Sequence, residues 1–428
     1  MVKLNLVHFF LAIVCVFTLQ IGYTVHLSVA GACFVVALIY GLRNLTLLSL
    51  GLALAGAVFL VVPIIFAPGG ISFDMLVRAG REALCLFILV AFKNIKPRFD
   101  QAAHVRIRRA LWIIILGLLL ITALQAIDLY TARSGRFFLP YNLLPKPISL
   151  ANCGTSADCW LKFGAEHGVL TLIRPAATYA EPSYLGFVIL CLVFASQKVM
   201  STNRAERTCF VVVGMVIALL AQTASGIAAL IAVLLVTNWK ALSRNVGIML
   251  LGLAFLVGAA VLLGDRLEAL MYGSDESGRI RLIYPFLAMG QMLEKGYIFG
   301  VPSESLSYVV RGDFAAAAGF TAGASDNALI NMFLLYGVGG FAVLAILFAR
   351  NSFAEIVLLV LSMQFNGAIF MYDKVILISL ALLLYKGQFE TRSASRPVSA
   401  RTIAFPAEAA DETLGRAAPQ VVTASSVS

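Results

Sequence analysis

Arg174, Glu181 and Pro182 stand directly before an apolar run in the segment "RPAATYAEPSYLGFVIL", residues 174 to 190. Proline suits the first position of a helix, where its missing N–H group would have no partner in any case. Glu181 then lies at the positive end of the helix dipole, which stabilises the ionised carboxylate. A helix cap is the simple structural interpretation of Glu181, and a functional carboxylate is the alternative.

A second basic segment, "SGRIRLIYPFLAMGQMLEKGYIFGVPSESL", contains Arg279 and Arg281. Its apolar residues recur at helical spacing, which predicts an amphipathic helix lying against the membrane or the bundle. These residues are Ile280, Ile283, Tyr284, Leu287 and Ala288. The two guanidinium groups could pair bidentately with a phosphate, or they could bind lipid headgroups at the interface.

Two other places combine polar residues with apolar helices. In "SDNALINMFLLYGVGG", Asp326 and Asn327 stand at the start of an apolar segment, where a helix cap is the default interpretation. Arg78, Arg81 and Glu82 lie inside a long apolar segment, although each charge at membrane depth costs about 2.5 to 3.5 kcal/mol on insertion scales. Arg78 and Glu82 are four residues apart and can pair on one helix face, so a structural role is also open.

The elements that must position these residues are membrane helices. Of the 428 residues, 61% are hydrophobic and only 13% are charged, which is too little polar surface for a soluble globule of this size. The apolar stretches reach the ~20 residues that a helix needs to cross a bilayer, and alternating barrel strands are missing. We therefore expect an all-α polytopic membrane bundle of about twelve transmembrane helices. Their approximate ranges are 4–20, 24–42, 45–66, 72–92, 110–130, 182–197, 208–222, 224–238, 246–263, 326–349, 353–369 and 374–387.

Basic residues predict the orientation of this bundle. The segment "KNIKPRFDQAAHVRIRR", residues 93 to 109, is rich in Lys and Arg, so we expect it in the cytoplasm together with both chain termini. Alternation from that segment puts two long connections, about residues 131–181 and 264–325, on the outer face. The short turn "FMYDK", which contains Lys374, falls on the same face. Because loops often carry sites, the outer face is where a site is expected.

The remaining sequence limits the chemistry. There is no P-loop and no His pair at metal-ligand spacing, so we expect neither a metal nor a cofactor. The net charge of +10 comes from short basic clusters between apolar runs, which does not suggest nucleic acid. Cys153 and Cys159 share the first outer connection and could form a disulfide on an oxidising face. Residues 1–387 form the expected transmembrane domain, and residues 388–428 have the composition of a disordered cytoplasmic tail.

The three quoted segments that carry Arg174, Arg279 and Asp326 resemble, in order and spacing, motifs of the O-antigen and exopolysaccharide polymerase family (Wzy-type) of bacterial inner membranes. The resemblance implies a fold similar to the C-type glycosyltransferases. It also implies a metal-independent enzyme that joins polyprenyl-diphosphate-linked oligosaccharides on the periplasmic face. The expected partners are these lipid-linked substrates, membrane lipids, a flippase and a chain-length regulator.

The resemblance also implies roles for particular residues. Arg174, Arg279 and Arg281 would stabilise the leaving diphosphate, and Glu181 or, as second choice, Asp326 would accept a proton from the attacking hydroxyl. The other candidates for binding diphosphate or sugar are Asn327, Lys374, Arg78 and Arg81. One departure concerns "TASGIAAL", where Gly226 stands at a position that often bears an arginine in the family, so a diphosphate contact there is in doubt.

Two alternatives stay open at the level of sequence. A ligase of the same clan would transfer a finished glycan, but ligases tend to carry a functional histidine near the outer start of a late helix, where this chain has Asp326 and Asn327. A lipid-linked-sugar flippase or another transporter would be expected to line the membrane midplane with broken helices and polar residues. The predicted helices, apart from the fourth, are nearly free of charge, which favours the polymerase.

Overall fold

The structure, a computed structural model, describes residues 23–131, 174–179, 182–238, 279–280, 283–312, 327–365 and 369–389. Regular structure in these residues is almost entirely helical, and the strands β1 (Arg98–Phe99) and β2 (Gln388–Phe389) have two residues each. The helices are α2 (Tyr23–Arg43), α3 (Leu47–Ile65), α4 (Phe73–Lys93), α5 (Gln101–Tyr130), α7 (Pro182–Val199), α8 (Arg204–Leu220), α9 (Ala224–Thr237), α13 (Tyr284–Glu294), η2 (Ser303–Ser305), α14 (Leu306–Val309), α16 (Ala328–Tyr336), α17 (Val338–Phe348), α18 (Phe353–Ser362) and α19 (Tyr372–Lys386).

Three of the described helices are long and apolar enough to cross a membrane: Leu47–Ile65 in α3, Gln101–Ile127 in α5 and Pro182–Val199, which is α7. These features are those of an all-α membrane protein. The apolar part of α7 is 83% buried, compared with 33% in α3 and 39% in α5, so α7 is an interior helix. The predicted helices at residues 4–20 and 246–263 lie outside the described residues.

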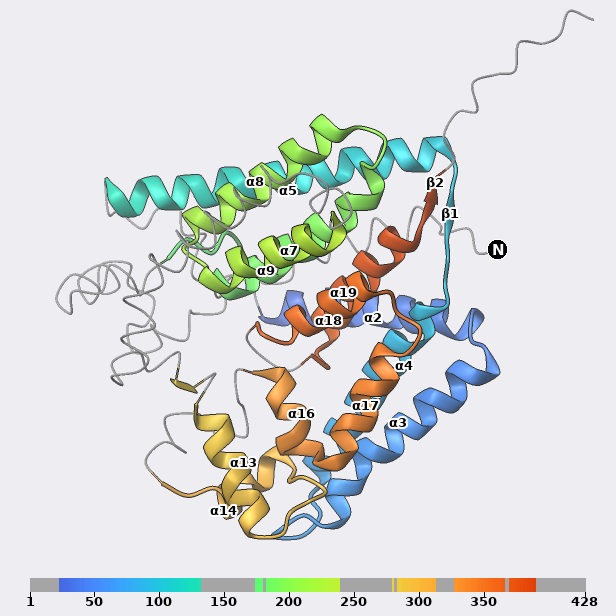
Figure 1. The fold of residues 1–428 in the computed structure, drawn as a ribbon, viewed down its shortest axis with the longest axis vertical. Helices are drawn as coiled ribbons and strands as arrows, with labels where there is room; N and C mark the ends of the chain where they lie inside the picture. Colours follow the sequence, from blue (N-terminus) through green and yellow to red (C-terminus); the bar gives the residue numbers. More distant parts are fainter. Residues whose placement is uncertain are drawn as a thin grey trace, which may run out of the picture. The chain divides into compact units, whose positions relative to one another are not determined.

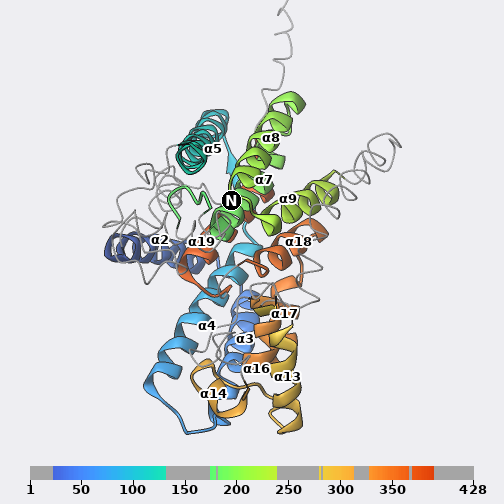
Figure 2. The same cartoon turned by 90° about the vertical axis from the view of Figure 1, so that its left-hand side faces the viewer.

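Helix α7 is enclosed by several neighbours. Among the described helices it packs against α5, α8, α9, α18 and α19 (Figures 1 and 2). Phe194 of α7 stacks on Tyr385 of α19 with their ring centroids 4.3 Å apart. A second group of helices, α3, α4, α16 and α17, packs together, and α4 joins the two groups through α19. The start of α7, where the predicted site begins, is thus fixed from several sides.

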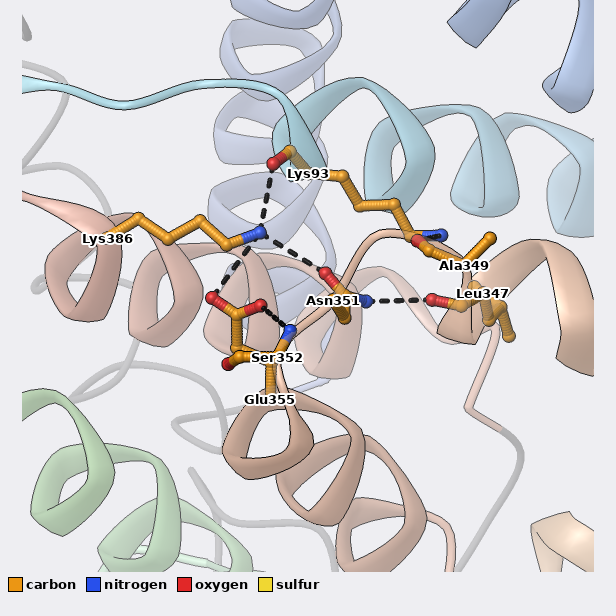
Figure 3. Close-up of polar contacts among 7 residues, drawn as sticks. All are labelled: Lys93, Leu347, Ala349, Asn351, Ser352, Glu355 and Lys386. Atoms are coloured by element: carbon orange, nitrogen blue, oxygen red, sulfur yellow. Dashed lines mark hydrogen bonds and ion pairs between the residues drawn. The ribbon is translucent and has the colours of Figure 1, made fainter. Parts of the chain in front are cut away.

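A cluster of polar side chains joins the ends of α4 and α19 to the turn between α17 and α18 (Figure 3). The Lys386 ammonium donates to the Lys93 carbonyl at 2.9 Å and lies 3.5 Å from Glu355. The Lys93 ammonium donates to the carbonyl of Ala349 at 3.1 Å, just past the end of α17. Glu355 accepts in turn from the backbone N–H of Ser352 at the start of α18. These lysines therefore satisfy carbonyl groups that the helix ends would leave unpaired.

The two short strands lie beside this cluster. β1 and β2 pair in parallel, with Arg98 opposite Gln388 and Phe99 opposite Phe389. The Phe389 ring lies 5.0 Å from the Phe99 ring and 4.6 Å from the His104 ring, measured between centroids. Three connections thus meet at one end of the helices: the one after α4, the one between α17 and α18, and the one after α19 (Figure 1). The first of them belongs to the basic segment of residues 93–109 that predicts the orientation.

Two predicted helix boundaries need correction. Helix α5 begins at Gln101 rather than near residue 110, because Asp100 caps it by accepting from the Ala103 N–H at 2.7 Å. Helix α18 ends at Ser362, whereas the sequence predicted helix to residue 369. Met363 and the residue after it form a turn instead, with the Met363 carbonyl accepting from Ala328 N–H at 2.9 Å.

The predicted single helix over residues 326–349 is wrong, because Gly337 divides it into α16 and α17. In a continuous helix, the Val338 N–H would donate to the Leu334 carbonyl. Here Val338 N–H donates to the Ile298 carbonyl at 3.0 Å, and the Leu334 carbonyl accepts from Val301 N–H at 2.9 Å. Residues 298–301 thus supply an acceptor for the Val338 N–H group and a donor for the Leu334 carbonyl group, the two groups that the break in the helix separates.

The predicted amphipathic helix also differs in position. Arg279 and Ile280 are helical, Ile283 lies in a turn, and α13 begins at Tyr284 with the buried residues Tyr284, Pro285, Ala288 and Met292. Leu287, which was expected on that face, is exposed. The spacing of four residues was therefore correct for Tyr284 and Ala288, while Leu287 belongs to the opposite side.

We predict that Gly337→Ala destabilises the protein strongly. Gly337 has φ 54° and ψ −132°, a conformation that costs a residue with a side chain about 1 to 3 kcal/mol. In addition, a Cβ atom there would overlap the Ile298 carbonyl oxygen. The measurement is the thermal midpoint in detergent, with Gly290→Ala as the control, because Gly290 lies in α13 with open space around it. Equal midpoints for the two variants would contradict the prediction.

Candidate functional site

The structure describes six of the predicted site residues, and these fall into three groups on the fold. Glu181, Arg281, Asp326, Cys153 and Cys159 lie outside the described residues. Arg174 and Lys374 lie near the start of α7, Asn327 and Arg279 precede α16 and α13, and Arg78 and Arg81 belong to α4. Helix α7 begins at Pro182, so the predicted helix start is confirmed.

The segment of Arg174 is held by a glutamine from α5. The Gln125 side chain accepts from the N–H groups of Ala176 and Ala177 at 3.0 and 2.9 Å. Its amide nitrogen donates to the Ala177 carbonyl at 2.8 Å. Ala177 has φ 52°, an uncommon value for a residue with a side chain. One buried side chain thus makes three hydrogen bonds to this turn. These bonds also fix the backbone near Arg174.

Arg174 connects this segment to the turn between α8 and α9. Its Nη1 donates to the Gln222 carbonyl at 3.2 Å. Gln222 has φ 51° and ends α8, while Thr223 N–H donates to the Ala218 carbonyl at 3.1 Å, which together make a Schellman motif. The motif turns the Gln222 carbonyl toward Arg174, so the guanidinium is directed by the backbone of a neighbouring helix end.

Two tyrosines and a buried carboxylate lie beside this segment. The rings of Tyr179 and Tyr184 stack with centroids 5.2 Å apart. The Tyr184 hydroxyl donates to a carboxylate oxygen of Asp373, and the other oxygen accepts from the Lys374 N–H at 2.9 Å. Asp373 lies in the first turn of α19, where the helix dipole stabilises its negative charge. This arrangement joins the first turns of α7 and α19 at the point where Glu181 meets Pro182 in the chain.

Lys374, which the sequence predicted in an exposed turn, is buried. Its side chain is only 1% exposed, and the ammonium donates to the Phe365 carbonyl at 3.2 Å. The same ammonium lies 5.7 Å from the centroid of the Phe187 ring. A buried lysine keeps its charge only where carbonyl groups or aromatic faces compensate for the lost water. Lys374 therefore contributes its charge to the interior, between α7 and the segment after α18.

Gly226 lies at a close contact between α7 and α9. A Cβ atom on Gly226 would approach the Cα atom of Gly186 to 3.2 Å and would overlap the Thr223 hydroxyl. The position that often bears an arginine in the resembled family thus has no room for any side chain here. The backbones of α7 and α9 are in close contact at this position, so no cationic side chain stands here. The guanidinium that reaches the turn before Gly226 is that of Arg174.

Asn327 and Arg279 make contacts that are sufficient for a structural role. The Asn327 side chain accepts from the N–H groups of Leu329 and Ile330 at 3.1 and 3.2 Å, so it caps α16. Its amide nitrogen donates to the Gln364 side chain at 3.2 Å. The Arg279 guanidinium lies 5.0 Å from the centroid of the Tyr284 ring, which is a cation–π contact at the start of α13.

Arg78, Glu82 and Tyr336 form a buried polar cluster between α4 and the end of α16. The Arg78 guanidinium lies 3.3 Å from one Glu82 oxygen, and the Tyr336 hydroxyl donates to the other. Arg78 also pairs at 3.0 Å with Glu304, which lies in η2. Arg81 follows on the same helix, and its buried Nε has no hydrogen-bond partner among the described residues. The predicted pair of Arg78 and Glu82 is therefore present, with Glu304 as a second carboxylate.

The sequence reasoning missed Gln125, Tyr184, Asp373, Glu304 and Tyr336. Gln125 and Asp373 carried a signal, because each is a polar residue at the edge of an apolar helix. Glu304 carried none, because it lies 226 residues from Arg78 in the chain. Among the described residues, no group of three His, Cys, Asp or Glu side chains could hold a metal ion.

Comparisons of the chain with models of known protein families, with curated proteins and with solved structures found no match.

We predict that Gln125→Leu loosens the segment of Arg174. The substitution leaves the Ala176 and Ala177 amides without their acceptor, and each unsatisfied buried group costs about 1 to 3 kcal/mol. We expect a lower thermal midpoint and faster hydrogen exchange in residues 174–179. Gln101→Leu, an exposed change on the same helix, is the control. Unchanged exchange in residues 174–179 of the Gln125→Leu variant would show that other contacts hold the turn.

Proposed function

We propose that the chain is a polysaccharide polymerase that joins polyprenyl-diphosphate-linked oligosaccharide units on the periplasmic face of a bacterial inner membrane. In this proposal the reducing-end sugar of one lipid-linked chain is transferred to a hydroxyl group of another, and polyprenyl diphosphate leaves. The chain then crosses the membrane about twelve times, with both termini in the cytoplasm. A flippase would supply its substrate, and a chain-length regulator would act on its product.

The observation that supports this proposal best is a set of contacts that connects the segment of Arg174 and α7 to the turn before "TASGIAAL" and, through residues 363–365, to the start of α16. Arg174 contacts the Gln222 carbonyl, next to "TASGIAAL", and Gly186 packs against Gly226. Phe187 contacts Phe365, and the turn before Phe365 accepts from Ala328 at the start of α16. These segments are far apart in the sequence, yet they form one continuous set of contacts around the start of α7.

The chemistry of this region suits a diphosphate leaving group. A diphosphate that leaves without a metal needs cations, and the Arg174 guanidinium at the turn between α8 and α9 is one. The stacked rings of Tyr179 and Tyr184 offer flat apolar surface next to polar groups. The attacking hydroxyl needs a general base, for which we propose Glu181, the residue that precedes the first turn of α7. Asp373 would keep Tyr184, three residues after Glu181, in a fixed position.

One observation favours a second candidate function, the movement of a lipid-linked sugar across the membrane. Transporters often use broken helices near buried charged residues. The break at Gly337 follows Tyr336 directly, and Tyr336 donates to the buried Glu82. The described part of the chain thus combines a broken helix with a charge in α4. Product analysis separates the two functions, because a transporter moves its substrate unchanged.

We predict that purified protein in nanodiscs converts lipid-linked repeat units into a ladder of longer chains, and that the ladder also forms in EDTA. Arg174→Gln should lower the rate by about a hundredfold or more, because one donor to a developing negative charge is lost. Glu181→Gln should lower it by about 10² to 10⁴, the range for loss of a general base. Chain lengths on a gel, sampled over time, are the measurement.

Arg106→Gln is the matched control for the arginine variant. Arg106 is exposed near the start of α5, which follows β1 directly, whereas Gln125 near the other end of α5 contacts the segment of Arg174, so the loss of Arg106 removes the same charge away from the candidate site. The ladder should form at the normal rate in this variant. A ladder that is unaffected by Arg174→Gln and Glu181→Gln would refute the assignment of the site. Substrate that crosses the membrane without growing would favour the transporter.

A further inference from the structure

Arg78 is shared between two carboxylates of different character. Glu82 is buried, lies four residues along the same helix, and also accepts from Tyr336. Glu304 is 32% exposed, comes from the second outer connection, and contacts Arg78 at 3.0 Å. Exposed ion pairs contribute little to stability, whereas breaking a buried pair leaves an uncompensated charge. Glu82 is therefore the permanent partner of Arg78, and Glu304 is the one that can be exchanged.

A second guanidinium makes this place suitable for an anion. Arg81 is close enough to Glu82 to interact with it electrostatically, and its buried Nε has no hydrogen-bond partner among the described residues. Glu304 brings an exposed negative charge to the two arginines, and its departure leaves them with less compensation. Two guanidinium groups near one another are the arrangement that phosphate groups bind best.

Exposed apolar side chains surround these charges. The rings of Phe66 and Phe299 stack with centroids 5.2 Å apart, the Tyr308 ring packs against Gly69, and the Ser305 hydroxyl donates to the Pro68 carbonyl at 2.9 Å. Figures 1 and 2 both show the turn between α3 and α4 beside α14. The exposed apolar residues here are Phe66, Phe73, Leu76, Val77, Phe299 and Tyr308.

The depth of Arg78 also fits a lipid headgroup. Arg78 lies five residues after the start of α4 at Phe73, which is about 7.5 Å along the helix axis. Tyrosine residues such as Tyr308 are typical of the interface between hydrocarbon and headgroups. A ligand with a phosphate group and a long hydrocarbon chain can satisfy the charges and the apolar surface together.

We propose that Glu304 occupies, on Arg78, the position that the diphosphate of an isoprenoid lipid takes when it binds. The hydrocarbon chain of the lipid then lies against the exposed apolar residues around Arg78. This inference rests on the proposed function, because the lipid is the carrier of the proposed substrate. Glu304 directly follows the segment that replaces the helical hydrogen bonds at Gly337.

The test measures binding of farnesyl diphosphate to the full chain in nanodiscs of uncharged lipid. Glu304→Gln removes the competing carboxylate and should tighten binding by about two- to fivefold, the factor that corresponds to an exposed ion pair. Glu294→Gln is the control, because Glu294 is an exposed carboxylate at the end of α13 and its loss changes the net charge equally. Its affinity should equal that of the unmodified chain. Arg78→Gln should weaken binding, and because it also leaves the buried Glu82 without its cation, the comparison of Glu304→Gln with Glu294→Gln carries the test.

Equal affinity in the Glu304→Gln and Glu294→Gln variants would overturn the proposal. Inorganic pyrophosphate that binds as tightly as farnesyl diphosphate would refute the part played by the apolar residues. Competition by phosphatidylglycerol at equal concentration would show a general headgroup site and would refute the isoprenoid assignment. Because the assay requires no turnover, binding that passes these tests in a chain that forms no ladder would disprove the polymerase and leave the site intact.

Discussion

Backbone polar groups at membrane depth must find partners within the protein, and this constraint explains much of the structure. The break at Gly337 is possible because Ile298 and Val301 supply the acceptor and donor that a continuous helix would have supplied itself. The turn at Ala177 is possible because Gln125 reaches it with both ends of its amide. At these two places a neighbouring segment completes the hydrogen bonds of irregular backbone, and candidate site residues lie beside both.

The same rule joins the two parts of the proposed mechanism. The region around Arg174 is fixed by backbone contacts from α5 and α8, so its guanidinium is directed before any substrate arrives. The region around Arg78 includes one partner, Glu304, that is exposed and exchangeable. In this mechanism the fixed guanidinium of Arg174 serves the diphosphate that leaves, and the exchangeable partner of Arg78 serves the diphosphate of the other lipid-linked chain, which stays attached.

Local features of the fold were predictable from the sequence, and long-range ones were not. The apolar periodicity predicted the helix that starts at Pro182, and the spacing of four residues predicted the pair of Arg78 and Glu82. The break at Gly337 was missed because the flanking residues are apolar on both sides, and only the partner segment around residue 300 makes the break favourable. Glu304 was missed for a related reason, because it is 226 residues from Arg78 in the chain and no local sequence pattern connects the two.

The two lysines in Figure 3 carry a consequence for how the orientation of this chain can be tested. The Lys93 ammonium donates to the Ala349 carbonyl and the Lys386 ammonium donates to the Lys93 carbonyl, so these side chains cap the ends of α17 and α4. Lysines beside membrane helices are also a general signal for orientation during insertion. A substitution that removes either charge in order to test orientation therefore also removes a helix cap, and it changes stability and orientation signal together.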